Sequence, residues 1–211
     1  DGLPSTLARP AGVLWNPRSP RGNVMTPTRV VLVAAALLLS AASLSRAEDG
    51  PPAPAPTPAP DPEREAALER ANELDQQVEA LYGQGKYAEA TERARESLAI
   101  REGALGTDHA YVGSSLNNLA VLLKSQGAYA EAKPLYERAL EIYEKALGAD
   151  HPDVAVTLND FGLFLLEQGR FAEAEANLHQ AEKIERRLYG QSHPDLAITL
   201  NNLALLRQRQ A

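Results

Sequence analysis

Apolar side chains recur every three or four positions along most of the chain, which is the spacing of amphipathic helices. From about His151 to Gln168, one helical face carries the apolar or small positions Val154, Leu158, Phe161, Gly162 and Leu165. A second helical pattern runs from about Phe171 to Leu188, with an inner face of Ala174, Leu178, Ala181, Ile184 and Leu188. The pattern predicts a pair of packed helices.

The ends of these helical segments carry capping signals. Asp150 and Ser192 each stand three residues before an acid, so we expect their side chains to cap the helices that follow. Pro152 and Pro194 fall in the first turn, where a missing N–H costs nothing. Gly169 stands where the first helix requires a left-handed C-cap.

The helix pair repeats with a period of 42 residues. Residues at equivalent positions of successive repeats, which we call a repeat column, are often identical. Such columns are His109, His151 and His193; Gly106, Gly148 and Gly190; and Asn117, Asn159 and Asn201, with Asp75 one period earlier. One pair cannot bury its apolar face alone, whereas stacked pairs form a continuous core. We therefore predict an all-α fold, a right-handed α-solenoid of three antiparallel helix pairs closed by a C-terminal capping helix.

Composition divides the chain into segments. Residues 1–24 are rich in Pro, Gly and Arg, lack a helical period, and are assigned as a disordered or non-native leader. Residues 48–62 form an Ala/Pro-rich linker, expected to be extended. Residues 63–211 hold the repeats, with units at about 66–107, 108–149 and 150–191 and a partial unit at 192–211.

Residues 25–47 have the layout of a secretory signal peptide. Arg29 precedes an apolar run at residues 30–44, and the small residues Ser45 and Ala47 mark a cleavage site after Ala47. The run is short for a membrane span, which takes roughly 20 residues. We expect a periplasmic or secreted protein. The alternative is an inner-membrane anchor formed by the same apolar run, and a membrane is a partner only if this segment stays uncleaved.

Charge and cysteine content narrow the range of partners. Residues 1–47 hold five Arg and one Asp, a net charge of +4, whereas residues 48–211 hold 16 Lys plus Arg and 27 Asp plus Glu, a net charge of −11. Phosphate binding needs Lys and Arg on one face, so the acidic repeat region argues against a nucleic-acid partner. The chain contains no cysteine, which excludes thiol nucleophiles and zinc-thiolate sites.

The polar residues form no catalytic or metal-binding pattern. Ser192, His193 and Asp195 lie within one helix cap and cannot form a chain of nucleophile, base and orienting acid. The repeated histidines begin separate helices, whereas a zinc ion needs ligands that converge on one point. We therefore expect no enzyme activity, no cofactor and no metal.

The repeated unit resembles the tetratricopeptide repeat, in the 42-residue version found in kinesin light chains and their bacterial relatives. The resemblance covers about residues 63–211 and rests on Leu119, Ala120 and Leu123 in the first helix of the central unit, on Ala132, Tyr136 and Ala139 in the second, and on the runs at 117–120 and 148–155. With the signal segment, it identifies the chain as an exported bacterial member of this type.

The first unit departs from the family pattern. Gln77 replaces a Leu, Val78 replaces an Ala, and Arg95 and Glu96 stand where the family prefers packing groups. We interpret this unit as an N-terminal cap with one face in water.

The resemblance also implies a protein-binding face. In resembling proteins the first helix of each pair lines the concave side and contacts an extended peptide. The corresponding stripe here is Ser114, Asn117, Val121, Lys124, Val156, Asn159, Leu163, Leu166, Ile198, Asn201 and Leu205. An Asn amide both donates and accepts, so the three asparagines either bind a peptide backbone or tie neighbouring helices together. The mixed apolar and amide character predicts a partly apolar peptide or helix as ligand.

We therefore expect a protein–protein interaction scaffold whose partner is another protein. Two alternatives stay open. One is a self-associating structural protein of the cell envelope, a homo-oligomer formed through the incomplete C-terminal repeat. The other is a regulatory fragment of a larger protein.

Overall fold

The computed structural model describes residues 61–210, whose regular structure is entirely helical. In chain order the helices are α1 (Pro62–Gly83), α2 (Tyr87–Leu105), α3 (Ala110–Ser125), α4 (Tyr129–Leu147), α5 (Pro152–Glu167), α6 (Phe171–Tyr189) and α7 (Pro194–Gln210). The predicted leader at 1–24, signal peptide at 25–47 and linker up to residue 60 lie outside the described residues. Within 61–210, no helix combines the length and apolar character needed to cross a membrane.

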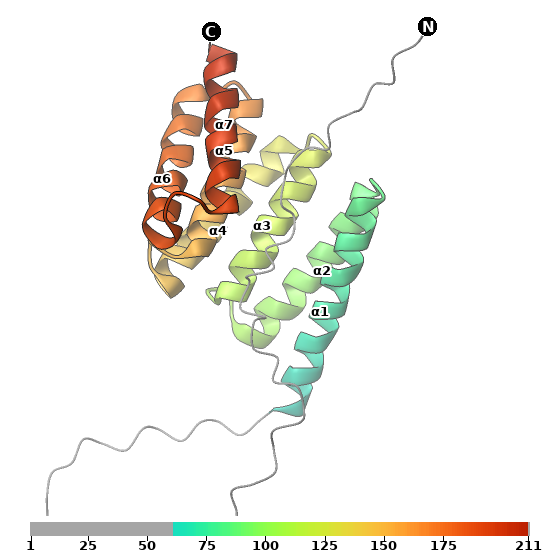
Figure 1. Cartoon of the computed structure of the whole chain (residues 1–211). Helices are drawn as coiled ribbons and strands as arrows, with labels where there is room; N and C mark the ends of the chain where they lie inside the picture. Colours follow the sequence, from blue (N-terminus) through green and yellow to red (C-terminus); the bar gives the residue numbers. More distant parts are fainter. Residues whose placement is uncertain (1–60, 211) are drawn as a thin grey trace, which may run out of the picture.

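Consecutive helices pack as antiparallel pairs. Helix α1 packs against α2, α3 against α4, and α5 against α6, and α7 closes the stack against α6. Contacts of α2 with α3 and of α4 with α5 join one pair to the next, and α5 also contacts α3 and α7. Figure 1 shows the pairs following one another in sequence order, from α1 at one end to α7 at the other. This arrangement confirms the predicted all-α solenoid of three pairs and a closing helix.

One buried apolar cluster runs through the stack, from Val78 in α1 to Leu206 in α7. Near its centre the Tyr136 ring is completely buried, with its centroid 5.4 Å from the rings of both Phe161 and Phe164. Helices of this length are marginally stable in isolation, so burial of this shared surface is what stabilises them.

Close approach within a pair depends on small residues in its first helix. A Cβ atom on Gly162 in α5 would lie 2.7 Å from Cγ of Leu178 in α6, closer than real Cβ atoms come. In the second pair, a Cβ on Gly113 would lie 3.2 Å from the Tyr143 ring. In the second and third pairs, the second helix therefore packs directly on glycine backbone of the first.

The helix boundaries of the third unit agree with the predicted ones to within about one residue. Gly169 has φ +73°, and the N–H of Arg170 donates to the carbonyl oxygen of Leu165 over 2.9 Å. These are the features of a Schellman C-cap, so the predicted left-handed glycine is confirmed. One core assignment is wrong: Leu188, in the last turn of α6, is 42% exposed.

The capping side chains predicted at the starts of the first helices are also wrong. In each case Nδ1 of the repeated histidine accepts a backbone N–H two residues ahead over 3.2 Å: His109 from Tyr111, His151 from Asp153, and His193 from Asp195. Asp150, which we expected to cap α5, pairs instead with Arg187 of α6. The ring nitrogen reaches the free N–H groups of the first turn, which explains why histidine recurs at this position.

Helix α1 begins inside the segment assigned to the linker. Oδ1 of Asp61 accepts hydrogen bonds from the N–H groups of Glu63 and Arg64 at 3.1 and 3.3 Å. Pro62 takes the first helical position, where its missing N–H leaves no bond unmade. The last two residues of the predicted linker are therefore the N-cap and the first residue of the folded region.

Candidate protein-binding face

The predicted binding stripe lies on α3, α5 and α7, the first helices of successive pairs. Four of its members are buried: Asn117, Val121, Asn159 and Leu166. The other seven have partly or fully exposed side chains: Ser114, Lys124, Val156, Leu163, Ile198, Asn201 and Leu205. We call these seven residues the first-helix face.

The two buried asparagines join neighbouring first helices. Nδ2 of Asn117 in α3 donates to Oδ2 of Asp160 in α5 over 3.0 Å. Oδ1 of Asn159 in α5 accepts from Nδ2 of Asn202 in α7 over 3.0 Å and from the Thr199 hydroxyl over 3.2 Å. Of the two roles left open by the sequence, these contacts correspond to the tie between helices.

Asn201 holds the same repeat position in α7 but is exposed. Within residues 61–210 the stack has no further first helix for it to bond. Contact between Asn201 and a partner therefore stays a prediction. The three asparagines of one sequence column thus stand in two different environments.

Electrostatic contacts cluster at the boundary between α3 and α5. Nζ of Lys124 lies 3.3 Å from Oε1 of Glu167, so the one cation of the predicted stripe has an acidic neighbour. Burial raises the pKa of Asp160 to about 6, while the Asn117 hydrogen bond and the Lys124 charge act in the opposite direction. The α3 end of the first-helix face is therefore polar and close to charge balance.

The α5 and α7 end of the same face is apolar. Val156 and Leu163 in α5 and Ile198 and Leu205 in α7 are all partly exposed. Each pair lies seven positions apart, which is two helical turns, so its members line one side of their helix. An accessible strip of branched aliphatic side chains on adjacent helices suits the apolar side of a peptide or helix.

A buried charge network in the first pair was not predicted from the sequence. The Arg101 guanidinium in α2 lies 2.6 Å from Oδ2 of Asp75 in α1 and donates to the Ser115 hydroxyl of α3 over 2.7 Å. Arg101 shares its repeat column with Tyr143 and Glu185, which are buried too. Because the three side chains differ in chemistry, similarity between repeats does not reveal that they occupy equivalent positions. The 42-residue period is the only sequence signal that relates them.

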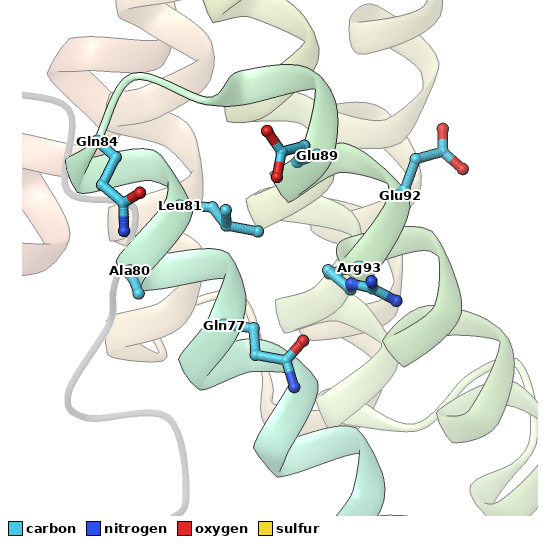
Figure 2. A pocket seen from close by; sticks show the side chains of 7 residues that line it. All are labelled: Gln77, Ala80, Leu81, Gln84, Glu89, Glu92 and Arg93. Atoms are coloured by element: carbon cyan, nitrogen blue, oxygen red, sulfur yellow. The ribbon is translucent and has the colours of Figure 1, made fainter.

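An open pocket lies between α1 and α2 at the start of the stack. Gln77, Ala80 and Leu81 of α1, with Gln84 just after it, form one wall, and Glu89, Glu92 and Arg93 of α2 form the other (Figure 2). Gln77 stands where the family pattern has a leucine, and it is exposed. The polar walls agree with the interpretation of the first unit as a cap with one face in water.

Among residues 61–210, no three His, Asp or Glu side chains come together as a group that would hold a metal ion. The repeated histidines use Nδ1 as helix-capping acceptors, as described above.

Comparison with known structures shows the same fold. The crystal structure of BtubC (BKLC) from P. vanneervenii superposes with a TM-score of 0.58 at 21% identity. The match covers 71% of this chain and 65% of that chain, so this chain spans less than two thirds of its length. At this identity the likeness concerns the fold alone. No curated protein matches the sequence.

Comparison with family models identifies the repeats. One tetratricopeptide-repeat model matches residues 78–111 and 112–153, and a second model of the same description matches residues 153–211. The matched segments are contiguous and make up more than half of the chain. The chain belongs to the tetratricopeptide-repeat family.

Proposed function

We propose that the chain is a protein–protein interaction scaffold that binds a peptide or helix of a partner protein on the first-helix face. Repeats of this family generally mediate contacts between proteins. The observation that carries the proposal is the accessible aliphatic strip formed by Val156, Leu163, Ile198 and Leu205 on adjacent helices. These side chains stay partly exposed although a continuous core lies beneath them.

The partner segment is partly apolar and carries no requirement for a free carboxylate. Lys124, the one cation of the face, is already paired with Glu167. A cluster of unpaired cations, which a carboxylate clamp needs, is absent from the seven residues of the face. Contacts with the aliphatic strip therefore dominate recognition, and Ser114 and Asn201 supply hydrogen bonds at its edges.

The protein is further proposed to be an exported, kinesin-light-chain-like member of the family, periplasmic or secreted after cleavage at Ala47. The 42-residue period and the layout of residues 25–47 support this. An inner-membrane protein anchored by residues 30–44 is the alternative. No catalytic family matches the chain, and we propose a role without enzyme activity.

Affinity capture with paired variants tests the proposed face. The face variant carries Leu163→Asp and Ile198→Asp, and the control carries Ala172→Asp and Ala176→Asp on the exposed side of α6. The wild-type chain and the control are expected to retain the same protein from an envelope extract of the source organism, whereas the face variant loses it. Circular dichroism confirms equal folding. Retention by the face variant at the wild-type level would refute the proposal.

A further inference from the structure

Glu185 places a buried carboxyl at the junction of three helices. It belongs to α6, which packs against both α5 and α7, and its side chain is 2% exposed. The carboxyl hydrogen-bonds with the Thr199 hydroxyl of α7, and within residues 61–210 its Oε2 atom has no hydrogen-bond partner. Burial penalises the ionised form of such a group far more than the neutral acid.

The same repeat column carries a balanced charge in the first pair of helices. Arg101 lies 2.6 Å from Oδ2 of Asp75 and donates to the Ser115 hydroxyl over 2.7 Å. One and two units later, Asn159 and Thr199 hold the repeat positions of Asp75 and Ser115. In the third pair the hydroxyl partner is therefore retained, whereas a neutral amide replaces the charged partner.

The hydrogen bonds of the Thr199 hydroxyl define the protonation state of its neighbour. Thr199 donates its single proton to Oδ1 of Asn159 over 3.2 Å, and the same oxygen accepts from Nδ2 of Asn202 over 3.0 Å. Because this proton is already used, the bond between Thr199 and the Glu185 carboxyl requires Glu185 to donate. Only the protonated carboxyl can do so, since a carboxylate is an acceptor alone.

We propose that Glu185 is a proton switch that controls how firmly α7 is held against α5 and α6. The protonated carboxyl donates to Thr199, which donates to Asn159, so one relay of hydrogen bonds connects α6, α7 and α5. An ionised Glu185 competes with Asn159 for the Thr199 proton and leaves a charge buried between the helices. Loss of one proton therefore weakens the contacts of α7 with both of its neighbours.

The charged surroundings of Glu185 favour the neutral acid. The charged groups that act on its carboxyl are both acids, Asp195 in α7 and Glu182 in α6. Each acid has a basic neighbour of its own, with Nδ1 of His193 3.6 Å from Asp195 and the Arg186 guanidinium 2.8 Å from Glu182. From α5, the side chain that reaches the same hydroxyl is a neutral amide.

The switch operates close to neutral pH. Burial raises the pKa of Glu185 from 4.5 to about 7, the Thr199 hydrogen bond acts in the opposite direction, and the two acids add to the rise. When α7 is released, the carboxyl meets water and its pKa returns toward 4.5. Between these two values the packed state keeps a proton that the released state has lost. The free energy that holds α7 in place therefore falls as pH rises from about 4.5 to about 7, and it stays low at higher pH.

The first-helix face acquires a pH dependence from this switch. Helix α7 supplies Ile198 and Leu205, half of the aliphatic strip, and the relay aligns them with Val156 and Leu163 of α5. Partner binding is then expected to weaken as Glu185 ionises. This consequence rests on the proposed function, whereas the switch itself concerns only contacts within the chain.

Hydrogen exchange of the backbone amides in α7, measured by mass spectrometry on the whole protein, tests the switch. Wild type is compared with Glu185→Gln, which keeps a donor for Thr199 and cannot ionise. At any one pH the intrinsic exchange rates of the two proteins are the same, so the ratio of their measured rates reports the opening of α7. From about pH 5.5 to about pH 8.5 the ratio of wild type to variant is expected to rise roughly tenfold or more.

Two controls accompany this measurement. The amides of α1 should show no change in the ratio, because α1 lies at the other end of the stack (Figure 1). Glu175→Gln alters an exposed carboxylate of α6 and should exchange like the wild type at every pH. A ratio for α7 that stays constant across the range, or the same response in Glu175→Gln as in Glu185→Gln, would overturn the proposal. No partner takes part in the experiment, so its outcome is independent of the proposed binding function.

Discussion

The side-chain amide of Asn117 donates a hydrogen bond to Asp160 over 3.0 Å, joining helices of neighbouring repeats through residues 43 positions apart. The bond between Asn202 and Asn159 spans the same sequence separation, again over 3.0 Å. We call these two bonds the asparagine ladder. Both lie in buried surroundings, where a polar group without a partner is costly. The ladder therefore fixes how successive first helices are aligned.

The asparagine ladder predicts that the same substitution changes the free energy of unfolding by very different amounts at two equivalent repeat positions. Asn159→Ala removes the acceptor of Thr199 and Asn202 and should lower the free energy of unfolding by about 2 kcal/mol. Asn201→Ala changes an exposed side chain in the same repeat column and should shift it by less than about 0.5 kcal/mol. Urea unfolding followed by circular dichroism checks both. Equal losses would contradict a structural role specific to the buried member.

The Asp160 carboxyl predicts a pH dependence of stability. Its pKa is raised by burial from 3.8 to about 6, so between those values the folded chain keeps a proton that the unfolded chain has lost. The free energy of unfolding contributed by this group therefore falls as pH rises from about 4 to about 6. Asp160→Asn keeps an acceptor for Asn117 and should remove this slope, with a gain on the order of 3 kcal/mol at pH 7.

Chemical unfolding of wild type and Asp160→Asn across pH 4 to 7.5 gives the free energy of unfolding of each protein at each pH. In the difference between the two proteins, the contributions of other titrating groups cancel. Glu141→Gln, which alters an exposed carboxylate of α4, serves as the control and should leave the slope in place. A variant slope equal to that of the wild type would show that the carboxyl does not titrate as described.

The buried ion pair of the first unit predicts a large cost for removing one partner. Asp75 and Arg101 are 6% and 3% exposed, so Asp75→Ala leaves a buried guanidinium without its carboxylate. We expect a loss of about 3–5 kcal/mol. Replacing both residues, with Asp75→Leu and Arg101→Met, should recover most of the loss because no buried charge remains. Hydrogen exchange of the backbone amides in α1 and α2 measures the stability of each variant. A double variant no more stable than Asp75→Ala would contradict the prediction.

The contact of Gly162 with Leu178 predicts coupled substitutions. Gly162→Ala forces the Leu178 side chain aside and should cost about 1–3 kcal/mol. In a Leu178→Ala background the same change meets no obstruction, so its cost should nearly vanish. A double-mutant cycle of unfolding free energies measures the coupling. Strict additivity of the two changes would mean that the helices are not in the close contact described.

Local chemistry made part of this fold predictable. The spacing of Leu158 and Leu165 depends only on helical geometry, and Gly169 follows from the backbone conformation that ends a helix. Both could be identified from a single repeat unit, and the period then placed them in the others. The stacked pairs follow because neither helix of a unit buries its apolar face alone.

The features that could not be predicted from the sequence depend on side-chain type at the caps or on contacts between helices far apart in the chain. Histidine is not among the residues usually expected to cap a helix, so the role of His151 was assigned to Asp150 instead. Arg101 carries no local sign that it is buried, because its carboxylate partner lies 26 residues away in another helix. For Asn117 the sequence left two roles open, and the partner that distinguishes them, Asp160, lies in the next repeat.

Site-specific photo-crosslinking tests the central claim, that a partner protein binds the first-helix face. A photoreactive amino acid is placed at Leu163 on that face, or at Ala176 on the exposed side of α6, and the chain is produced in its source organism. The account predicts one discrete adduct with another protein from position 163 and none from position 176. Adducts from position 176 alone, or the same adduct from both positions, would contradict it.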